Sequence, residues 1–262
     1  MKIALIGAGN VATHLGMALS KAGFNVLQVY SHTLASAQVL GEKMMIPFTN
    51  KIEGITKEAD LYLVAIKDAA LQAFIPDLVK GRQHAFFVHT AGSMPRDIWK
   101  EYALHYGVLY PMQTFSKQRE IDFTTVPFFV EASSREELLT LKRIGLALGS
   151  NFYEVSSEQR KRLHLAAVFA CNFANHMYAL SARILEKEGI PFEVMESLID
   201  ETSKKIHELS PVEAQTGPAV RYDTNVMDRQ LSLLADEPEM QDIYRKVSDS
   251  IHRLAIKNEK RI

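Results

Sequence analysis

The stretch Lys2-Ile3-Ala4-Leu5-Ile6-Gly7-Ala8-Gly9-Asn10-Val11-Ala12 decides the fold of the first half of the chain. An apolar run typical of a buried strand leads directly into a G-x-G-x-x-A turn, and apolar residues then recur at helical spacing until Gly23. In a dinucleotide-binding βαβ unit, Gly7 permits the tight turn, Gly9 lets the backbone approach a pyrophosphate, and Ala12 lets the helix pack closely on the strand. A glycine-rich turn without a ligand is the alternative. The order of strand, turn and helix favours a Rossmann unit.

Short apolar runs alternate with amphipathic stretches through the first half of the chain, which predicts βαβ units and a doubly wound, mostly parallel sheet. Several of the runs are apolar throughout, as strands covered on both faces are. The predicted strands are Lys2–Ile6, Asn25–Tyr30, Leu61–Ile66, Ala85–His89, Gly107–Tyr110, Pro127–Glu131 and Phe152–Val155, with a weaker candidate at Ile46–Phe48 and a helix at Arg135–Leu148.

The pattern changes to helical spacing after residue 155. Ser156 and Gln159 resemble a capping box, and apolar residues then recur at helical spacing as far as Ile184. Further helices are predicted after Pro191, at Thr224–Leu234 and at Pro238–Ile256. We therefore expect an α/β protein with an NAD(P)-binding Rossmann domain at residues 1–155 and an all-helical C-terminal domain at residues 156–262, which binds substrate or forms a dimer.

Composition excludes several classes of function. The 262 residues carry 30 basic and 31 acidic side chains, so a formal charge of −1 gives no overall field that would attract nucleic acid or anionic lipid. Cys171 is the only cysteine, which excludes an internal disulfide and fits a reducing cytoplasm. No apolar run approaches the roughly 20 residues that span a bilayer, and no histidine spacing predicts a metal site. We expect a cytoplasmic protein whose partner is a small molecule, not nucleic acid or a membrane.

The end of the second predicted strand indicates which dinucleotide binds. An Asp or Glu there would bind the ribose 2′-hydroxyl and repel a 2′-phosphate. This chain has Ser31-His32-Thr33 instead, which offers hydroxyl and imidazole groups and no carboxylate. We therefore predict NADP as the cofactor and keep NAD as the alternative, because the arginine usual at an NADP site is also absent. Ser31 and Thr33 can instead simply cap the following helix.

Ligands of open α/β sheets bind beyond the carboxyl ends of the strands. Three loops at such ends carry reactive groups, namely Lys67-Asp68, His89-Thr90-Ala91-Gly92-Ser93 and Tyr110-Pro111-Met112-Gln113-Thr114. Solvated charges and turn hydroxyls are the alternative roles for these residues. The predicted cofactor-binding residues are Gly7, Gly9, Asn10, Val11, Ala12, Ser31, His32, Thr33, Ile66, Lys67, Thr90 and Ala91.

Two further stretches are distinctive, namely His164-Leu165-Ala166-Ala167-Val168-Phe169-Ala170-Cys171-Asn172 and Thr216-Gly217-Pro218-Ala219-Val220-Arg221-Tyr222-Asp223. Together with the glycine turn and the last two loops above, they resemble a bacterial family that joins a Rossmann-like domain to a C-terminal domain of unknown function. The family is classed with NADP oxidoreductases. It is distantly similar to pyrroline-5-carboxylate reductases and to the 6-phosphogluconate dehydrogenase C-terminal-like group. The resemblance covers nearly the whole chain and implies a fold and a cofactor class without a substrate. The chain has Tyr222 where the family usually has glycine, and Gln230 where histidine is common.

Hydride reduction of a carbonyl or imine needs a group beside the nicotinamide that donates a proton or stabilises charge. His164 is the most plausible proton donor by residue type, although it can also be a helix histidine bound to a carbonyl or carboxylate. Asn172 and Asn175 lie among apolar residues, where they can orient a substrate or bridge helices. One small substrate cannot touch all three, because His164 and Asn172 lie about 12 Å apart along one helix. The sequence does not choose between them.

Arg221 and Asp223 follow Gly217-Pro218 in a predicted loop. They can position a carboxylate-bearing substrate or pair with each other. The predicted catalytic residues are His164, Asn172, Arg221 and Asp223.

The sequence as a whole favours an NADP-dependent oxidoreductase that transfers a hydride between NADP(H) and a small, anionic carbonyl or imine metabolite. The alternative is a non-catalytic dinucleotide-binding protein that senses redox state or regulates a partner. We also expect a homodimer, because the helical domain of about 105 residues is too small to cover all the apolar faces of its own helices. The apolar positions of its long helix include Phe169, Phe173, Met177 and Leu180.

Overall fold

The structure, a computed structural model, describes residues 1–259. It divides into a first compact unit, Met1–Asn172, and a second that begins at Phe173. The first unit thus includes residues 156–172, which follow the boundary expected near residue 155. That boundary stays a prediction about domain organisation.

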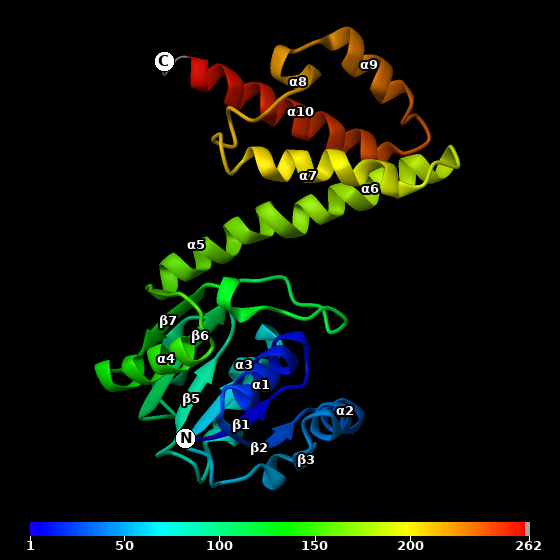
Figure 1. Cartoon of the computed structure of the whole chain (residues 1–262). Coiled ribbons are helices and arrows are strands. Elements are labelled where there is room, and N and C mark those ends of the chain that lie inside the picture. Colours follow the sequence, from blue (N-terminus) through cyan, green and yellow to red (C-terminus); the bar gives the residue numbers. More distant parts are fainter. Residues whose placement is uncertain (260–262) are drawn as a thin grey trace. The chain divides into compact units, whose positions relative to one another are not determined.

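The first unit is built on one sheet (Figure 1). Within residues 1–259 it has eight strands in the order β3-β2-β1-β4-β5-β6-β7-β8, and every neighbouring pair is parallel except β6 and β7. The predicted mostly parallel, doubly wound sheet is confirmed. The strands are β1 (Lys2–Ile6), β2 (Asn25–Tyr30), β3 (Phe48–Thr49), β4 (Leu61–Val64), β5 (Phe86–His89), β6 (His105–Pro111), β7 (Phe128–Ala132) and β8 (Phe152–Glu154).

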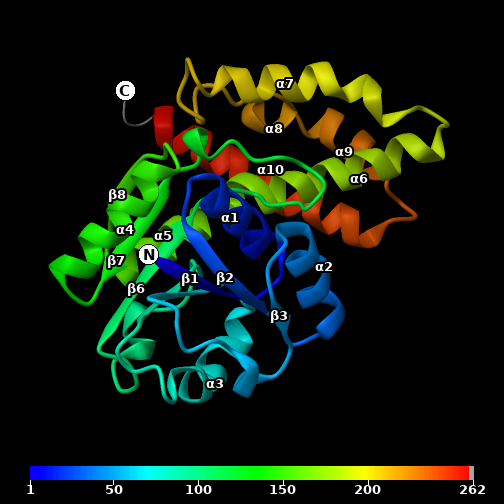
Figure 2. The same ribbon diagram turned by 60° about the horizontal axis from the view of Figure 1, so that its bottom comes forward.

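Helices cover both faces of this sheet, which explains the continuous apolar runs. Alternate residues of β1 show the arrangement: Ile3 and Leu5 pack in the cluster that contains Leu15, while Ala4 and Ile6 pack in the cluster that contains Ile75. The helix α3, which carries Ile75, therefore lies on the other side of the sheet from α1, as Figure 2 shows. The four helices are α1 (Asn10–Lys21), α2 (Leu34–Met44), α3 (Asp68–Val79) and α4 (Arg135–Ala147), and short 3₁₀ segments lie at Ile52–Gly54, Arg96–Trp99 and Phe123–Thr125.

Helix α5 (Ser157–Ala167) begins at the predicted capping box, where Ser156 and Gln159 bond each other's backbone N–H groups. On α5, Leu163 packs against a small cluster of buried residues from β6 and β7. The single long helix expected from the sequence is divided, because a π-helical segment at Val168–Phe173 precedes α6 (Ala174–Lys187). Such wide turns are rare, and they occur frequently at functional sites.

The second unit is helical, as predicted, and has few buried side chains. Among its described residues only Ala219, Met227, Met240 and Ser248 are buried. Its helices are α6, α7 (Glu196–Lys205), α8 (Pro218–Arg221), α9 (Thr224–Ser232) and α10 (Pro238–Glu259), with a 3₁₀ turn at Phe192–Met195. The two predicted helices nearest the C-terminus are confirmed as α9 and α10. No helix within residues 1–259 has both the length and the apolar character to cross a membrane.

Candidate functional site

The glycine turn between β1 and α1 has room for an anion. Gly7 has a φ of 117°, and its N–H donates to the carbonyl oxygen of Tyr30 (2.7 Å). Gly9 precedes α1 in an extended conformation, and no side chain in the described chain caps the helix there. A β-carbon built on Gly9 would meet none of the chain's described atoms within 4 Å. The free N–H groups and the positive dipole end of α1 therefore face open space, as phosphate binding requires.

Asn10 and His14 connect α1 to the loop that follows β6. Asn10 Nδ2 donates to the carbonyl oxygen of Phe115 (2.7 Å), and His14 Nε2 lies 3.0 Å from the carbonyl oxygen of Ser116. The His14 ring also packs on the Phe115 ring, with centroids 5.6 Å apart. The Asn10 side chain thus anchors this loop. Its backbone N–H belongs to the first turn of α1, where such groups have no partner within the helix.

Exposed polar groups follow β2. His32 and Thr33 are exposed, and Ser31 is partly so. Thr33 occupies the N-cap of α2, but its hydroxyl donates to Ser36 Oγ (2.7 Å) and accepts no backbone N–H within residues 1–259. The Thr33 side chain therefore does not cap α2, which was the alternative role for this residue.

The loops after β4 and β5 meet at a side-chain hydrogen bond. Asp68 begins α3 just after Lys67, and its carboxylate accepts a hydrogen bond from the Ser93 hydroxyl. Ile66 lies beside the glycine turn, because a β-carbon on Gly7 would come within 3.3 Å of its side chain. Residues that follow β1, β4 and β5 are thus brought together at the carboxyl ends of these strands.

His89, the last residue of β5, shapes the loop that contains Thr90 and Ala91. It is completely buried, the Ala91 N–H donates to its Nδ1 (3.2 Å), and its Nε2 lies 3.4 Å from the carbonyl oxygen of Pro95. Burial lowers the pKa of His89 to about 3, and the positive charge of Arg160 adds to this. The ring is therefore neutral at physiological pH and acts as a structural support for the loop.

His164 of α5 reaches the carboxyl end of β6. A hydrogen bond of 3.1 Å joins its Nδ1 to the Tyr110 hydroxyl oxygen. The two rings meet edge to face, with centroids 5.9 Å apart. A β-carbon on Gly92 would also come within 2.7 Å of Nδ1. The structure thus brings His164 against the loops after β5 and β6, in the same unit as the glycine turn.

Arg160 lies one helical turn before His164 and is completely buried. It donates to Glu131 Oε2 (2.7 Å) and to the carbonyl oxygen of Met94 (2.5 Å), while its Nε has no partner within residues 1–259. Breaking a buried ion pair of this kind is costly, because the remaining charge is left without compensation. This pair therefore fixes α5 against the sheet.

The two asparagines of the long helix are exposed, contrary to the expectation of buried amides. Asn172 lies in the π-helical segment at the end of the first unit, and Asn175 lies in the second. The apolar neighbours that predicted burial are themselves largely exposed, as Phe169 is. Neither amide therefore needs an internal partner to satisfy its hydrogen bonds.

Arg221 and Asp223 lie in the second unit and have separate surroundings. Asp223 is the N-cap of α9 and accepts a hydrogen bond from the Val226 N–H (3.3 Å). Tyr222 between them has a φ of 52° and stacks on His252 with centroids 4.4 Å apart. No ion pair of the described chain joins Arg221 to Asp223. The predicted alternative of a simple charge pair is therefore not observed, and Asp223 has a structural role.

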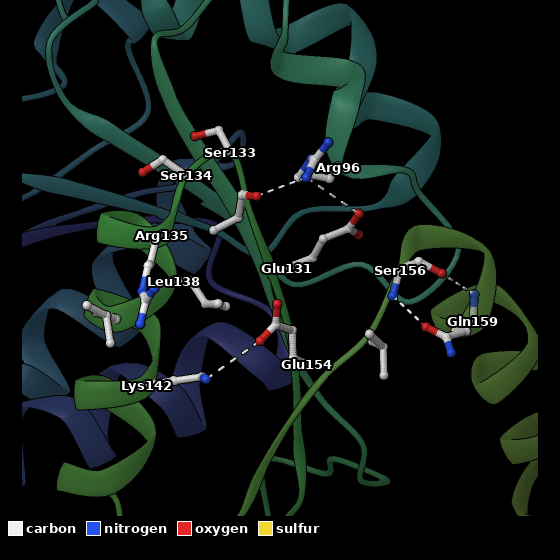
Figure 3. Close-up of a pocket in the computed structure, with 13 residues that line it drawn as sticks. Arg96, Glu131, Ser133, Ser134, Arg135, Leu138, Lys142, Glu154, Ser156 and Gln159 are labelled. Atoms are coloured by element: carbon white, nitrogen blue, oxygen red, sulfur yellow. Dashed lines mark hydrogen bonds and ion pairs between the residues drawn. The ribbon is translucent and has the colours of Figure 1, made fainter.

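A cavity of about 930 Å³ lies between β7, α4 and the start of α5 (Figure 3). Two ion pairs lie in its wall, Lys142 with Glu154 (3.6 Å) and Arg96 with Glu131 (3.9 Å). Ala132 on its wall pairs with Gly107, near the amino end of β6, whereas Tyr110 lies near the carboxyl end. The described lining contains no residue that the sequence predicted for cofactor or catalysis. This cavity is therefore separate from the candidate site.

Comparison with known proteins agrees with this arrangement. Residues 1–107 match a Rossmann-like domain, and residues 126–251 match a domain of unknown function, DUF2520. A solved structure from Bacteroides fragilis, described as a "putative NADP oxidoreductase", is 53% identical over 96% of this chain and 98% of its own, with a TM-score of 0.93. The chain belongs to the family that joins a Rossmann-like domain to DUF2520. The resemblance inferred from the sequence is thus confirmed.

More distant solved structures share the fold of this DUF2520 protein. An imine reductase from Myxococcus stipitatus in complex with NADP⁺ is 17% identical, over 99% of this chain and 94% of its own, with a TM-score of 0.67. A 1-pyrroline-5-carboxylate reductase from Streptococcus pyogenes is 15% identical, over 97% and 98%, with a TM-score of 0.63. No curated protein sequence matches the chain.

Sequence reasoning assigned no role to two groups at the site of this DUF2520 protein, Tyr110 and Arg160. A signal for each was present. Tyr110 opens a loop at a predicted strand end, and Arg160 precedes His164 by four residues, which places both on one face of the predicted helix. Their partners come from distant parts of the chain, and only the fold identifies them.

Proposed function

We propose that this protein is an NADP-dependent oxidoreductase that transfers a hydride between NADP(H) and a small, anionic carbonyl or imine metabolite. The open space at Gly9, in front of the N-terminus of α1, is the observation that carries the proposal. The description of the Bacteroides relative supports the cofactor class. The absence of a carboxylate in Ser31-His32-Thr33 supports NADP over NAD.

The residues of the first unit fit such a cofactor. The glycine turn would hold the pyrophosphate, the residues after β2 the 2′-phosphate, and the loops after β4 and β5 the nicotinamide half. When bound, the reduced nicotinamide supplies a hydride to an electrophilic carbon. The proposed binding residues are Gly7, Gly9, Asn10, Val11, Ala12, Ser31, His32, Thr33, Ile66, Lys67, Thr90 and Ala91.

We propose His164 as the residue that exchanges a proton with the substrate. It lies between Tyr110 and Gly92 at the carboxyl ends of β5 and β6, where ligands of such sheets bind. Imine reduction and pyrroline-carboxylate reduction, named for two structures that share the fold, need a proton on nitrogen along with the hydride.

We propose that the second unit recognises the anionic group of the substrate through Arg221. A guanidinium binds a carboxylate through two parallel hydrogen bonds, and Arg221 has no ion-pair partner within residues 1–259. Asp223 then supports the loop as the cap of α9. Asn172 remains a candidate for orienting the substrate.

The test is the consumption of NADPH by the purified protein with a panel of small ketones, keto acids and cyclic imines. Turnover that requires the carboxylate of a substrate supports the proposal. The control is Gly9→Val, which is expected to keep the fold and lose the cofactor. NADPH binding without turnover on any compound contradicts an enzymatic function and favours a redox sensor or regulator.

We further propose that the protein is a homodimer and that it works in the cytoplasm. Among the described residues of the second unit, Met227 and Met240 are the only large apolar side chains that are buried, while Leu198, Val194 and Ile206 are more than half exposed. A helical unit with so little core gains more by packing against a second copy than by standing alone. The free thiol of Cys171 fits a reducing compartment.

A further inference from the structure

We propose that Tyr110 is a positioning residue that holds His164 Nδ1 and thereby makes Nε2 the atom that passes a proton to the substrate. This inference rests on the proposed function, since it assigns an atom to the proton transfer that a reductase needs. The hydrogen bond of 3.1 Å between Tyr110 and His164 Nδ1 is its starting point.

The His164 ring is fixed by two neighbours. Tyr110 meets it edge to face, and Gly92 passes so close that any β-carbon there would strike Nδ1. Tyr110 itself is buried, with 9% of the residue's surface exposed, and packs on Phe129 with centroids 6.3 Å apart. Tyr110 therefore cannot turn away from His164 without disturbing the sheet face beneath it.

The backbone that carries His164 is fixed as well. Arg160, one turn earlier on α5, is tied to Glu131 of β7 and to the carbonyl oxygen of Met94. Because residues four apart on a helix share a face, this buried ion pair sets where His164 lies along β6. The helix cannot shift along β6 without breaking it.

A phenol suits both charge states of the imidazole ring. Its oxygen accepts a hydrogen bond from Nδ1–H in the neutral ring and in the protonated ring alike, because a hydroxyl oxygen carries acceptor lone pairs. Burial raises the pKa of Tyr110 above its ordinary value, against the opposing charge of Arg160, so the hydroxyl keeps its hydrogen at neutral pH. Nε2 is therefore without a hydrogen in the neutral ring and carries one in the protonated ring, and it has no partner within residues 1–259.

The proton step balances through Nε2 alone. In imine reduction the hydride adds to carbon, the Nε2–H bond of the protonated ring breaks, and an N–H bond forms on the amine. Nδ1 keeps its hydrogen towards the Tyr110 oxygen throughout, and water then returns a proton to Nε2. In the oxidation direction Nε2 accepts the proton that the substrate loses.

The first test measures the ring nitrogens of His164 by NMR in protein labelled with ¹⁵N-histidine, with the signals assigned through His164→Gln. We expect one neutral tautomer, with hydrogen on Nδ1, in the wild type and a mixture of both in Tyr110→Phe. Tyr153→Phe is the matched control, because Tyr153 also packs on Phe129, at 5.5 Å, but has no contact with His164 among the described residues. The same tautomer in Tyr110→Phe as in the wild type would overturn the inference.

The second test uses NADPH with 1-pyrroline and 1-pyrroline-5-carboxylate as probes. Tyr110→Phe is expected to lower kcat by about 10- to 100-fold, with KM and NADPH affinity unchanged, while Tyr153→Phe has wild-type kcat. Equal kcat for Tyr110→Phe and wild type overturns the inference and leaves the proposed function standing. A wild type that binds NADPH but reduces neither imine contradicts the imine reaction itself, and the tautomer measurement then decides separately whether Tyr110 positions the ring.

Discussion

Gly7 lies so close to Ala65 that a β-carbon on Gly7 would come within 2.2 Å of the Ala65 carbonyl oxygen. Because φ of Gly7 is also 117°, an L-residue there is both strained and in collision with backbone. Gly7→Ala is therefore expected to destabilise the fold by about 3 kcal/mol or more, as a fall in thermal unfolding temperature.

Gly9→Val is expected to behave in the opposite way. The fold should keep its unfolding temperature, since a β-carbon at Gly9 meets no described atom, but the side chain fills the space meant for pyrophosphate. We expect NADPH affinity to fall at least about 100-fold, or about 2.7 kcal/mol, in fluorescence titration. Equal titration curves for Gly9→Val and wild type would remove the cofactor site from the glycine turn.

The residues after β2 predict NADP over NAD by at least about tenfold in dissociation constant, or about 1.4 kcal/mol. Ser31→Asp should reduce this preference, because the new carboxylate repels a 2′-phosphate and binds a 2′-hydroxyl. Ser31→Asn is the matched control without charge. A tenfold preference of the wild type for NAD would show that the missing carboxylate does not predict NADP binding.

Substitutions of Arg221 and Asp223 should have different effects, the first on catalysis and the second on stability. Arg221→Lys keeps the charge and loses the planar fork, so it should lower kcat/KM on an anionic substrate while NADP affinity and thermal stability stay unchanged. Asp223→Ala removes the cap of α9 and should cost about 0.5–2 kcal/mol in stability. Since no ion pair of the described chain joins them, their stability effects should add. A double mutant less destabilised than the sum would reveal a pairing that the structure lacks.

His89 predicts a specific loss of stability in acid. Its pKa is about 3 in the folded chain and about 6.5 when unfolded, so the unfolded state binds more protons between these values. The contribution of neutral His89 to the free energy of unfolding is complete above about pH 6.5. It falls by about 1.4 kcal/mol for each pH unit below that value, down to the folded pKa. Between pH 7 and pH 5 the free energy of unfolding of His89→Gln should therefore fall by about 2 kcal/mol less than that of the wild type. Chemical denaturation at the two pH values measures this difference. His32→Gln, at an exposed histidine, should behave like the wild type.

Light scattering at micromolar concentration tests the proposed homodimer. The expected mass is twice the chain mass of 29.5 kDa. Ile184→Glu, on the partly exposed apolar face of α6, should shift the mass towards the monomer because it places a charge in a buried interface. Leu104→Glu, at an exposed leucine of the first unit, is the control. A wild-type mass near 29.5 kDa refutes the proposal.

Local patterns determined most of the architecture. The predicted bounds of β1 and β2 are those observed, because each is a mostly apolar run bounded by turn residues. The capping box at Ser156 predicted the start of α5, because its two residues, Ser156 and Gln159, are close together in the sequence. The sequence therefore determined the doubly wound sheet, the glycine turn, the helical second half and the family.

Tertiary structure decided what the polar residues do. The partner of Asn10 is Phe115, and that of His164 is Tyr110, each brought near by strands that are distant in sequence. The expected burial of Asn172 did not occur, since an apolar helix face is buried only if another surface covers it. Periodicity tells which residues share a face, while the packing of strands and helices decides what that face meets. For that reason the sequence indicated His164 as a candidate residue, and only the fold identified Tyr110 as its hydrogen-bond partner.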